Sequence, residues 1–160
     1  MSTSDYKNDA LKAREKLDSV SPTMCLAKWN QTSLHLPTGM TNSCYHPPLH
    51  NIDADAVKLN PAALHNTTDK LQQRDQMLKG ERPTGCSYCW KLEDTGEMSD
   101  RQYRSGEPWA MQDFDDIRKN PLDDKWTPRY VEVNFNNACN LKCSYCSPQF
   151  STTWGKETDR

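Results

Sequence analysis

Three cysteines near the end of this 160-residue chain stand at a spacing that limits what the chain can become. Cys139, Cys143 and Cys146 follow the pattern C-x3-C-x2-C, and Tyr145 directly precedes the last of them. Three thiolates leave a metal centre one ligand short. An iron–sulfur cluster held by three cysteines keeps one iron open to a small molecule. The spacing therefore indicates a chemical site rather than a structural cross-link.

The chain is poor in the residues that usually build a core. Leu, Ile, Val and Phe account for 22 of its 160 residues, which is below the roughly one fifth at which a self-sufficient core becomes doubtful. A net charge of only −2 and five Trp argue against disorder. We therefore expect bound metal to stabilise the fold, and we expect the chain to be the N-terminal part of a longer protein.

Charge and cysteine content exclude several classes of protein. The 20 basic and 22 acidic residues form no basic run, so nucleic acid is not an expected partner. No apolar stretch is long enough to cross a membrane, and the polar N-terminus lacks the hydrophobic region of a secretory signal. Seven cysteines cannot all pair as disulfides, and thiols in a reducing compartment more often bind metal. These features predict a cytoplasmic metal-binding protein without a membrane partner.

A β-strand is predicted directly before the three cysteines. Residues 129–135 alternate in a β-like pattern rich in Val, Tyr and Phe, and Asn136 and Asn137 end it. This strand and the motif that follows resemble the radical S-adenosylmethionine (radical SAM) superfamily, whose pattern C-x3-C-x-aromatic-C is matched at the cysteine positions and at Tyr145. The resemblance covers a short stretch, residues 130–146, and its pattern is specific.

The resemblance implies a fold and a chemistry. The strand would be the first of a partial (β/α)6 TIM-like barrel, and Cys139, Cys143 and Cys146 would hold a 4Fe–4S cluster on the loop after it. The open iron would bind S-adenosylmethionine (SAM). With an electron donor, the cluster would cleave SAM reductively to a 5′-deoxyadenosyl radical. Tyr145 would pack near the adenine, mainly through its backbone.

The other four cysteines form a second candidate site. Cys25, Gly39 and Cys44 match the first half of the pattern C-x(9–15)-G-x4-C, and Cys86 and Cys89 follow after a gap. This arrangement resembles the Twitch/SPASM auxiliary iron–sulfur domain, although that domain usually follows the barrel. The resemblance implies a closed cluster with four thiolate ligands, and by analogy a peptide or protein substrate. Gly39 lies in a predicted turn that needs a positive φ.

Zinc is the alternative metal, because thiolate ligands suit both zinc and iron–sulfur clusters. The four upstream cysteines would make a tetrahedral zinc site, or Cys86 and Cys89 would pair with Cys143 and Cys146 as a zinc ribbon. In that case the chain would be a small structural or interaction module without catalysis. His46, two residues after Cys44, is expected to lie near the site rather than to replace a cysteine.

The predicted fold class is α+β: a loop-rich, metal-stabilised N-terminal region followed by the first β/α unit of a truncated barrel. We divide the chain into an N-terminal helix or arm (1–20), a Twitch-like cluster region (21–105), a linker (106–128) and the start of the barrel (129–160). Only 14 residues follow Cys146, whereas six β/α units need roughly 190 residues.

Two helices are predicted in the N-terminal part. The first covers residues 4–20 and carries Ala10, Leu11 and Leu17 on its apolar stripe. The second lies between Asn60, its N-cap, and Gly80, just beyond its end, and its apolar edge is expected to carry the leucines Leu64, Leu71 and Leu78, with Met77 beside them. Nearby, Trp90 is a candidate to shield a metal centre from solvent or to fill the core.

Overall fold

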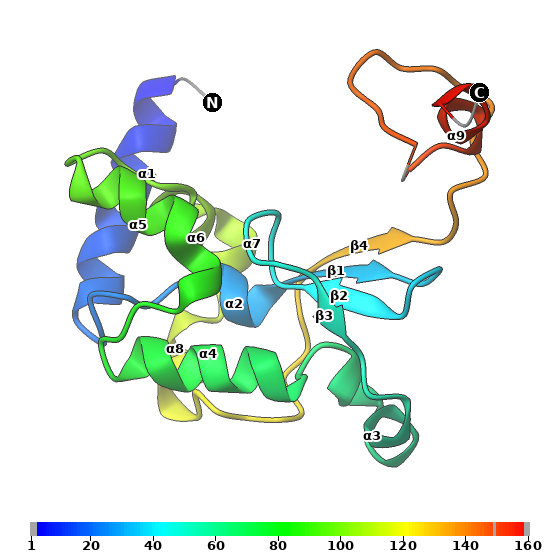
Figure 1. Ribbon diagram of the computed structural model, residues 1–160. Coiled ribbons are helices and arrows are strands. Elements are labelled where there is room, and N and C mark those ends of the chain that lie inside the picture. Colours follow the sequence, from blue (N-terminus) through cyan, green and yellow to red (C-terminus); the bar gives the residue numbers. More distant parts are fainter. Residues whose placement is uncertain (1–2, 149, 159–160) are drawn as a thin grey trace.

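The computed structural model describes residues 3–148 and 150–158 and has a mixed α+β fold (Figure 1). The α+β class predicted from the sequence is thus confirmed. Its elements along the chain are α1 (Thr3–Asp18), α2 (Ala27–Asn30), β1 (Gln31–His35), β2 (Met40–Asn42), β3 (His50–Asn51), α3 (Ala54–Leu59), η1 (Pro61–Leu64), α4 (Thr68–Leu78), η2 (Thr84–Cys86), α5 (Ser87–Asp94), α6 (Asp100–Gly106), α7 (Pro108–Met111), α8 (Phe114–Lys119), β4 (Tyr130–Asn134) and α9 (Thr152–Thr158).

The strands form one small mixed sheet in the order β3-β2-β1-β4. β1 pairs with β2 in antiparallel register and with β4 in parallel register, from Gln31 opposite Tyr130 to His35 opposite Asn134. The predicted strand is therefore confirmed as β4. β1, β2 and β3 were not predicted, and β1 gives β4 its partner. Gly39 adopts a φ of 64° in the β1–β2 turn, as expected.

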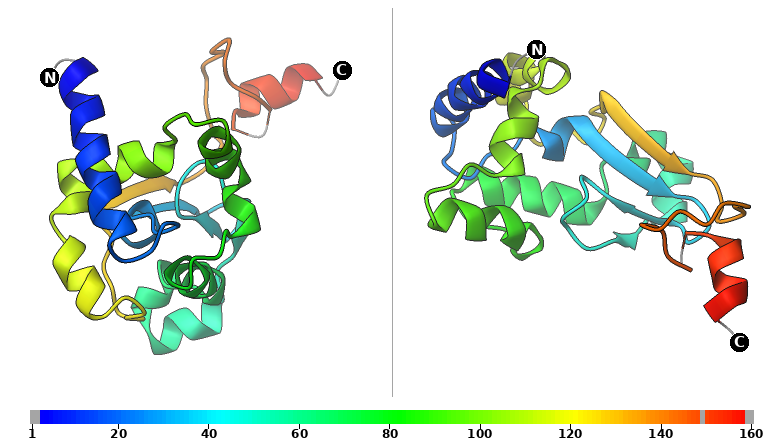
Figure 2. Two further views of the ribbon diagram at one scale, coloured as in Figure 1. Left: turned by 90° about the vertical axis from the view of Figure 1, so that its left-hand side faces the viewer. Right: turned by 90° about the horizontal axis from the view of Figure 1, so that it is seen from above.

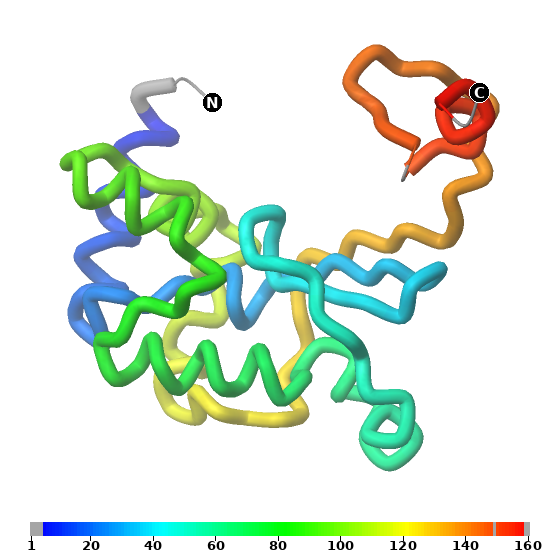
Figure 3. Tube along the Cα trace, in the orientation of Figure 1, coloured from blue at the N-terminus to red at the C-terminus, as the bar shows by residue number. Residues whose placement is uncertain are grey.

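The helices gather on one side of the molecule, and the C-terminal loop and α9 lie at its other end (Figures 1 and 2). The tube in Figure 3 shows the chain leaving β4, making a wide loop and then entering α9. This arrangement places the last three cysteines away from the helical core.

The core combines large aromatic and sulfur-containing side chains with a few branched aliphatic ones, Leu17, Leu26 and Ile117. Its fully buried members include Trp29, Met24 and Met77, and two of the seven cysteines, Cys25 and Cys86, are among its buried residues. This choice accounts for the low content of Leu, Ile, Val and Phe, because aromatic and thioether side chains supply the buried apolar area instead.

The first predicted helix is confirmed as α1, with a different buried stripe. Ala10, Ala13 and Leu17 are buried, whereas Leu11 is 42% exposed. Small residues on this face let α1 approach α6 closely, because Gly106 at the end of α6 lies directly against the backbone of Ala10. A Cβ added at Gly106 would come within 3.0 Å of the Ala10 Cα.

Gly106→Ala is therefore expected to destabilise the fold by about 1–3 kcal/mol, because α1 would have to move away from α6. The thermal midpoint would fall by about 2–4 °C for each kcal/mol, measurable by circular dichroism. Gly155→Ala in α9 is the matched control, since the nearest atom to its added Cβ would lie 4.0 Å away. Equal midpoints for the two variants would refute close packing of α1 on α6.

The predicted helix over residues 60–80 is divided in two. Asn60 caps the short η1, accepting a hydrogen bond from the Ala62 N–H at 3.1 Å. α4 then starts afresh after its own N-cap, Thr67, and Gly80 follows its end with a φ of 77°. Both the predicted N-cap and the predicted terminating glycine are correct, but the helix between them is interrupted.

The buried face of α4 is cationic, which the sequence did not predict. Lys70 and Arg74 are fully buried, and Met77 is 1% exposed. Leu64, which was expected on the apolar edge of the helix, is 37% exposed and belongs to η1. Leu78 does pack against the core as predicted. The burial of Lys70 and Arg74 was missed because hydropathy alone places lysine and arginine outside.

The segment 106–128, predicted as a linker, contributes to the core. It contains α7 and α8, and the side chains of Ala110, Phe114 and Ile117 belong to the main core cluster. The Trp126 side chain, at its end, donates to Asn30 Oδ1 at 2.9 Å. In the structure this segment packs against the helical region and then leads into β4.

Candidate metal centres

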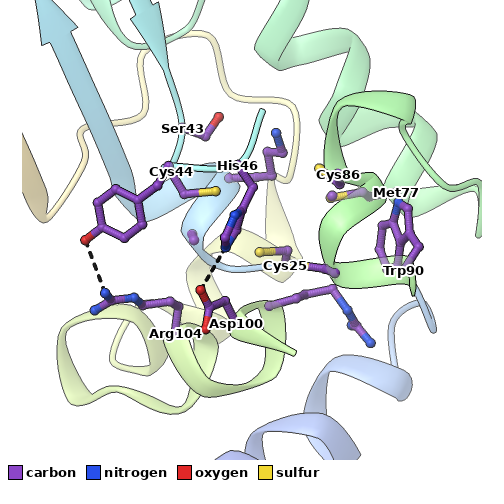
Figure 4. A pocket seen from close by; sticks show the side chains of 14 residues that line it. Cys25, Ser43, Cys44, His46, Met77, Cys86, Trp90, Asp100 and Arg104 are labelled. Carbon is purple, nitrogen blue, oxygen red and sulfur yellow. Dashed lines mark hydrogen bonds and ion pairs between the residues drawn. The ribbon is translucent and has the colours of Figure 1, made fainter. Parts of the chain in front are cut away.

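The fold brings the four upstream cysteines to one cavity. Cys25 precedes α2, Cys44 follows β2, Cys86 ends η2 and Cys89 lies in the first turn of α5. All four are free thiols that line a cavity of about 20 Å³. In Figure 4 the sulfur atoms of Cys25, Cys44 and Cys86 face the same space. Residues separated by up to 64 positions in sequence thus meet at the edge of the helical core.

Local structure positions the last pair of these cysteines. Cys86 and Cys89 are three residues apart at the start of α5, so they share one face of the helix. Gly85 packs under Pro47 and Pro48, where an added Cβ would lie 3.2 Å from the nearest Pro48 atom. This close approach seats the start of α5 against the loop that carries Cys44.

Trp90 closes the side of the cavity next to α5. Its indole Nε1 donates to the Pro83 carbonyl at 3.0 Å, and the guanidinium of Arg101 lies 5.4 Å from its ring centroid. Arg101 itself is held by Glu93 through two hydrogen bonds of 2.8 and 2.7 Å. Trp90 therefore fills the core, as one of its two suggested roles, and it also lines the cavity, while shielding of a metal centre stays a prediction.

Burial makes the thiols weak acids. It raises the pKa of Cys25 to about 12 and that of Cys89 to about 11, and it also raises the pKa of Cys44. For Cys25, the three neighbouring cysteines add to this effect. At neutral pH these three thiols are therefore protonated in the metal-free chain, and metal binding would release protons.

His46 lines the same cavity but has a partner of its own. Its Nε2 lies 2.8 Å from Asp100 Oδ2 (Figure 4). Its ring stacks on Tyr88 with centroids 4.0 Å apart. A carboxylate that fixes an imidazole is typical of residues that support a metal site. This placement agrees with the prediction that His46 lies near the site.

The donor set fits a thiophilic metal, whereas the present spacing is not that of a formed site. Within the described part of the chain, no group of three or more His, Cys, Asp or Glu side chains is arranged to hold a metal ion. A cavity of about 20 Å³ has room for about one water-sized species. The four thiols would therefore have to rearrange to bind either a single ion or a four-iron cluster.

The second group, Cys139, Cys143 and Cys146, lies on the loop after β4, and all three thiols are partly exposed. The start of α9 holds this loop. Thr153 Oγ1 donates to the Cys139 carbonyl at 2.6 Å, and Trp154 Nε1 donates to the Cys143 carbonyl at 3.1 Å. Neither of these supporting residues was predicted from the sequence. A side chain that donates to a backbone carbonyl does not create a recognisable spacing of residue types in the sequence.

Tyr145 projects from this loop with 90% of its surface exposed. A hydrogen bond with Cys143 raises the pKa of its phenol. Next to the loop, a cavity of about 730 Å³ opens between β1, β4 and the segment that follows β4, and its lining includes Glu132, Phe135 and Phe150. Its volume is in the range of small-molecule sites. The cysteines themselves are not part of its lining.

No helix in the described residues is both long enough and apolar enough to cross a membrane. A comparison of the chain with known protein-family models, with curated proteins and with solved structures finds no match. The function therefore has to be argued from the two cysteine groups and the elements that carry them.

Proposed function

We propose that the chain belongs to a radical SAM iron–sulfur enzyme, with the SAM-binding 4Fe–4S cluster on Cys139, Cys143 and Cys146. The observation that carries the proposal is the position of these cysteines. They lie on the loop after the carboxyl end of β4, a strand in parallel pairing, and the helix α9 follows. Loops at this end of parallel strands are where β/α barrels place their chemistry.

In this proposal β4 and α9 are the first β/α unit of a partial (β/α)6 barrel. The bound cluster would supply the electron that cleaves SAM to a 5′-deoxyadenosyl radical. The chain's own residues would keep the loop in place, since Thr153 and Trp154 hold the carbonyls of two ligand residues. The partly exposed thiols leave SAM and an electron donor access to the site. A peptide or protein substrate stays a prediction.

The cavity formed by Cys25, Cys44, Cys86 and Cys89 would hold the auxiliary centre of this enzyme, with all four thiolates bound. It would stabilise the region that contains the helical core, because Cys25 and Cys86 belong to the core cluster. The second candidate function, a zinc module without catalysis, is favoured by one observation. The cavity has room for about one small species.

Anaerobic reconstitution with iron and sulfide separates these two functions. Two four-iron clusters should give a brown protein with about seven to eight iron atoms and a similar amount of sulfide per chain. Iron and sulfide analysis, together with the absorbance near 400 nm, would measure this. A colourless protein that keeps stoichiometric zinc under the same conditions would overturn the enzyme proposal in favour of the zinc module.

A further inference from the structure

Three buried cations next to the four-cysteine cavity have no carboxylate partner. Lys28 is 2% exposed, and Lys70 and Arg74 are fully buried. Within residues 3–148 and 150–158, none of the three takes part in an ion pair. Lysine and arginine are almost never fully buried unless they are paired. The cluster therefore calls for a negative charge that the described chain does not supply.

The hydrogen-bond partners of these cations are neutral. Lys70 Nζ donates to the hydroxyls of Thr32 and Thr41 at 2.7 and 3.0 Å, and Lys28 Nζ donates to the amide oxygen of Gln73. The guanidinium of Arg74 donates from Nε to the Lys28 carbonyl at 3.0 Å. Its Nη1 donates to Asn66 Oδ1 at 2.7 Å, and its Nη2 lies 2.9 Å from Nε2 of His65. Each cation is solvated by dipoles, and within the described residues none of the three forms an ion pair.

The charged forms are under electrostatic strain in the metal-free chain. Burial, followed by repulsion from Arg74 and Lys28, lowers the pKa of Lys70 to about 7, and burial lowers the pKa of Arg74 to about 9. At Arg74, attraction from Asp123 opposes the effect of burial. A fold that buries cations together in this way gains stability when an anion arrives beside them.

The four-cysteine cavity is where that anion would lie. Lys28 is part of the cavity lining together with all four cysteines. Lys70 lies behind this lining, because its Nζ donates to Thr41 in β2, the strand that leads to Cys44. Two of the other charged groups that line the cavity are already paired with opposite charges, Arg101 with Glu93 and Arg104 with Glu107. The carboxylate of Asp100 is engaged in a hydrogen bond with His46.

We propose that Lys28 and Lys70 are built-in counter-charges for an anionic four-thiolate metal centre on Cys25, Cys44, Cys86 and Cys89. A divalent ion with four thiolates carries two net negative charges, and so does an oxidised 4Fe–4S cluster with four thiolates. The two lysines match this charge for either metal, and Arg74 supports Lys28 through its carbonyl. The inference rests on the metal centre proposed above and adds the residues that determine its charge balance.

The test is an anaerobic Co²⁺ titration of the metal-free chain, with Cys139, Cys143 and Cys146 all changed to Ser so that only the upstream site responds. The thiolate-to-Co²⁺ absorbance gives the dissociation constant. Lys70→Met and Lys28→Met should each weaken binding by about 10- to 100-fold. The same variants should leave the thermal midpoint of the metal-free chain unchanged or raise it, because each removes an uncompensated buried charge.

These opposite effects separate a counter-charge from a purely structural lysine, whose loss would lower the midpoint of the metal-free chain. Lys91→Met, at an exposed position two residues after Cys89, is the matched control and should leave both quantities unchanged. If Lys28→Met binds Co²⁺ with unchanged affinity, the inference about the counter-charges is overturned, even if Lys70→Met does not fold. The metal centre itself would still stand. Absence of any thiolate-to-Co²⁺ band in the parent chain would overturn the metal centre as well.

Discussion

Loading the four-cysteine cavity with Zn²⁺ is expected to raise the thermal midpoint of the chain by about 10 °C or more. Structural zinc sites bind tightly, a free Zn²⁺ concentration of about 1,000 times the dissociation constant stabilises the fold by about 4 kcal/mol, and each kcal/mol corresponds to about 2–4 °C in a chain of this size. Since the unfolded chain holds no preformed site, this binding energy adds to the stability of the fold. Cys25 and Cys86 belong to the core cluster, so the core would share the gain.

The measurement is a pair of circular dichroism melts, with and without Zn²⁺, under anaerobic and reducing conditions. Cys86→Ser should abolish most of the rise, because three thiolates remain and the fourth donor becomes a weaker ligand. Cys139→Ser should keep the rise, since Cys139 lies on the separate loop after β4. Equal midpoints for the metal-free and loaded parent chain would show that the cavity is a packing feature and not a metal centre.

The grouping of the upstream cysteines could be predicted because each of its signals is local. Cys86 and Cys89 lie on one helical turn, and the turn at Gly39 returns the chain toward Cys44. The meeting of the two halves depends on Gly85 packing under Pro47 and Pro48, which no short pattern contains. The sequence therefore predicts which residues form the site, and the fold shows how they meet.

The sheet was harder to predict because its central strand is polar. Gln31, Thr32 and Ser33 are all buried in β1, although none is apolar. Their burial comes from neighbours on both sides, since β1 pairs with β2 through a tight turn and with β4 from the far end of the chain. A parallel pair between such distant segments leaves no trace in local hydropathy.

The cations on α4 show the same limitation more clearly. Hydropathy predicts that Lys70 and Arg74 face solvent, yet both are fully buried. Lys70 is held by the hydroxyl groups of Thr32 in β1 and Thr41 in β2. Arg74 is held by the Lys28 carbonyl and by Asn66. These partners come from other parts of the chain, so local hydropathy carries no sign of them.

Cys143→Ala is expected to remove the loop cluster and leave the upstream centre intact. The variant keeps only two of the three thiolates on the loop, so about four of the seven to eight iron atoms should be lost after reconstitution. Cys86→Ala should instead lose the iron atoms of the upstream centre and keep those of the loop cluster. Ser144→Ala, at an exposed position in the same turn, is the control and should keep the full iron content. Iron analysis of the three variants under one protocol would measure this.

The same variants separate an open iron from a closed one. SAM added to the dithionite-reduced parent should change the electron paramagnetic resonance signal of one cluster, because only a cluster with three thiolates has a free coordination position. The change should survive in Cys86→Ala and Ser144→Ala and be absent in Cys143→Ala. A response to SAM that persists without Cys143, or one that disappears without Cys86, would place the open iron elsewhere than on the loop after β4.

Trp154→Phe refines the result, since it removes the hydrogen bond to the Cys143 carbonyl and keeps an aromatic ring. It should weaken the response to SAM without removing the iron, because the loop would lose a support and keep its ligands.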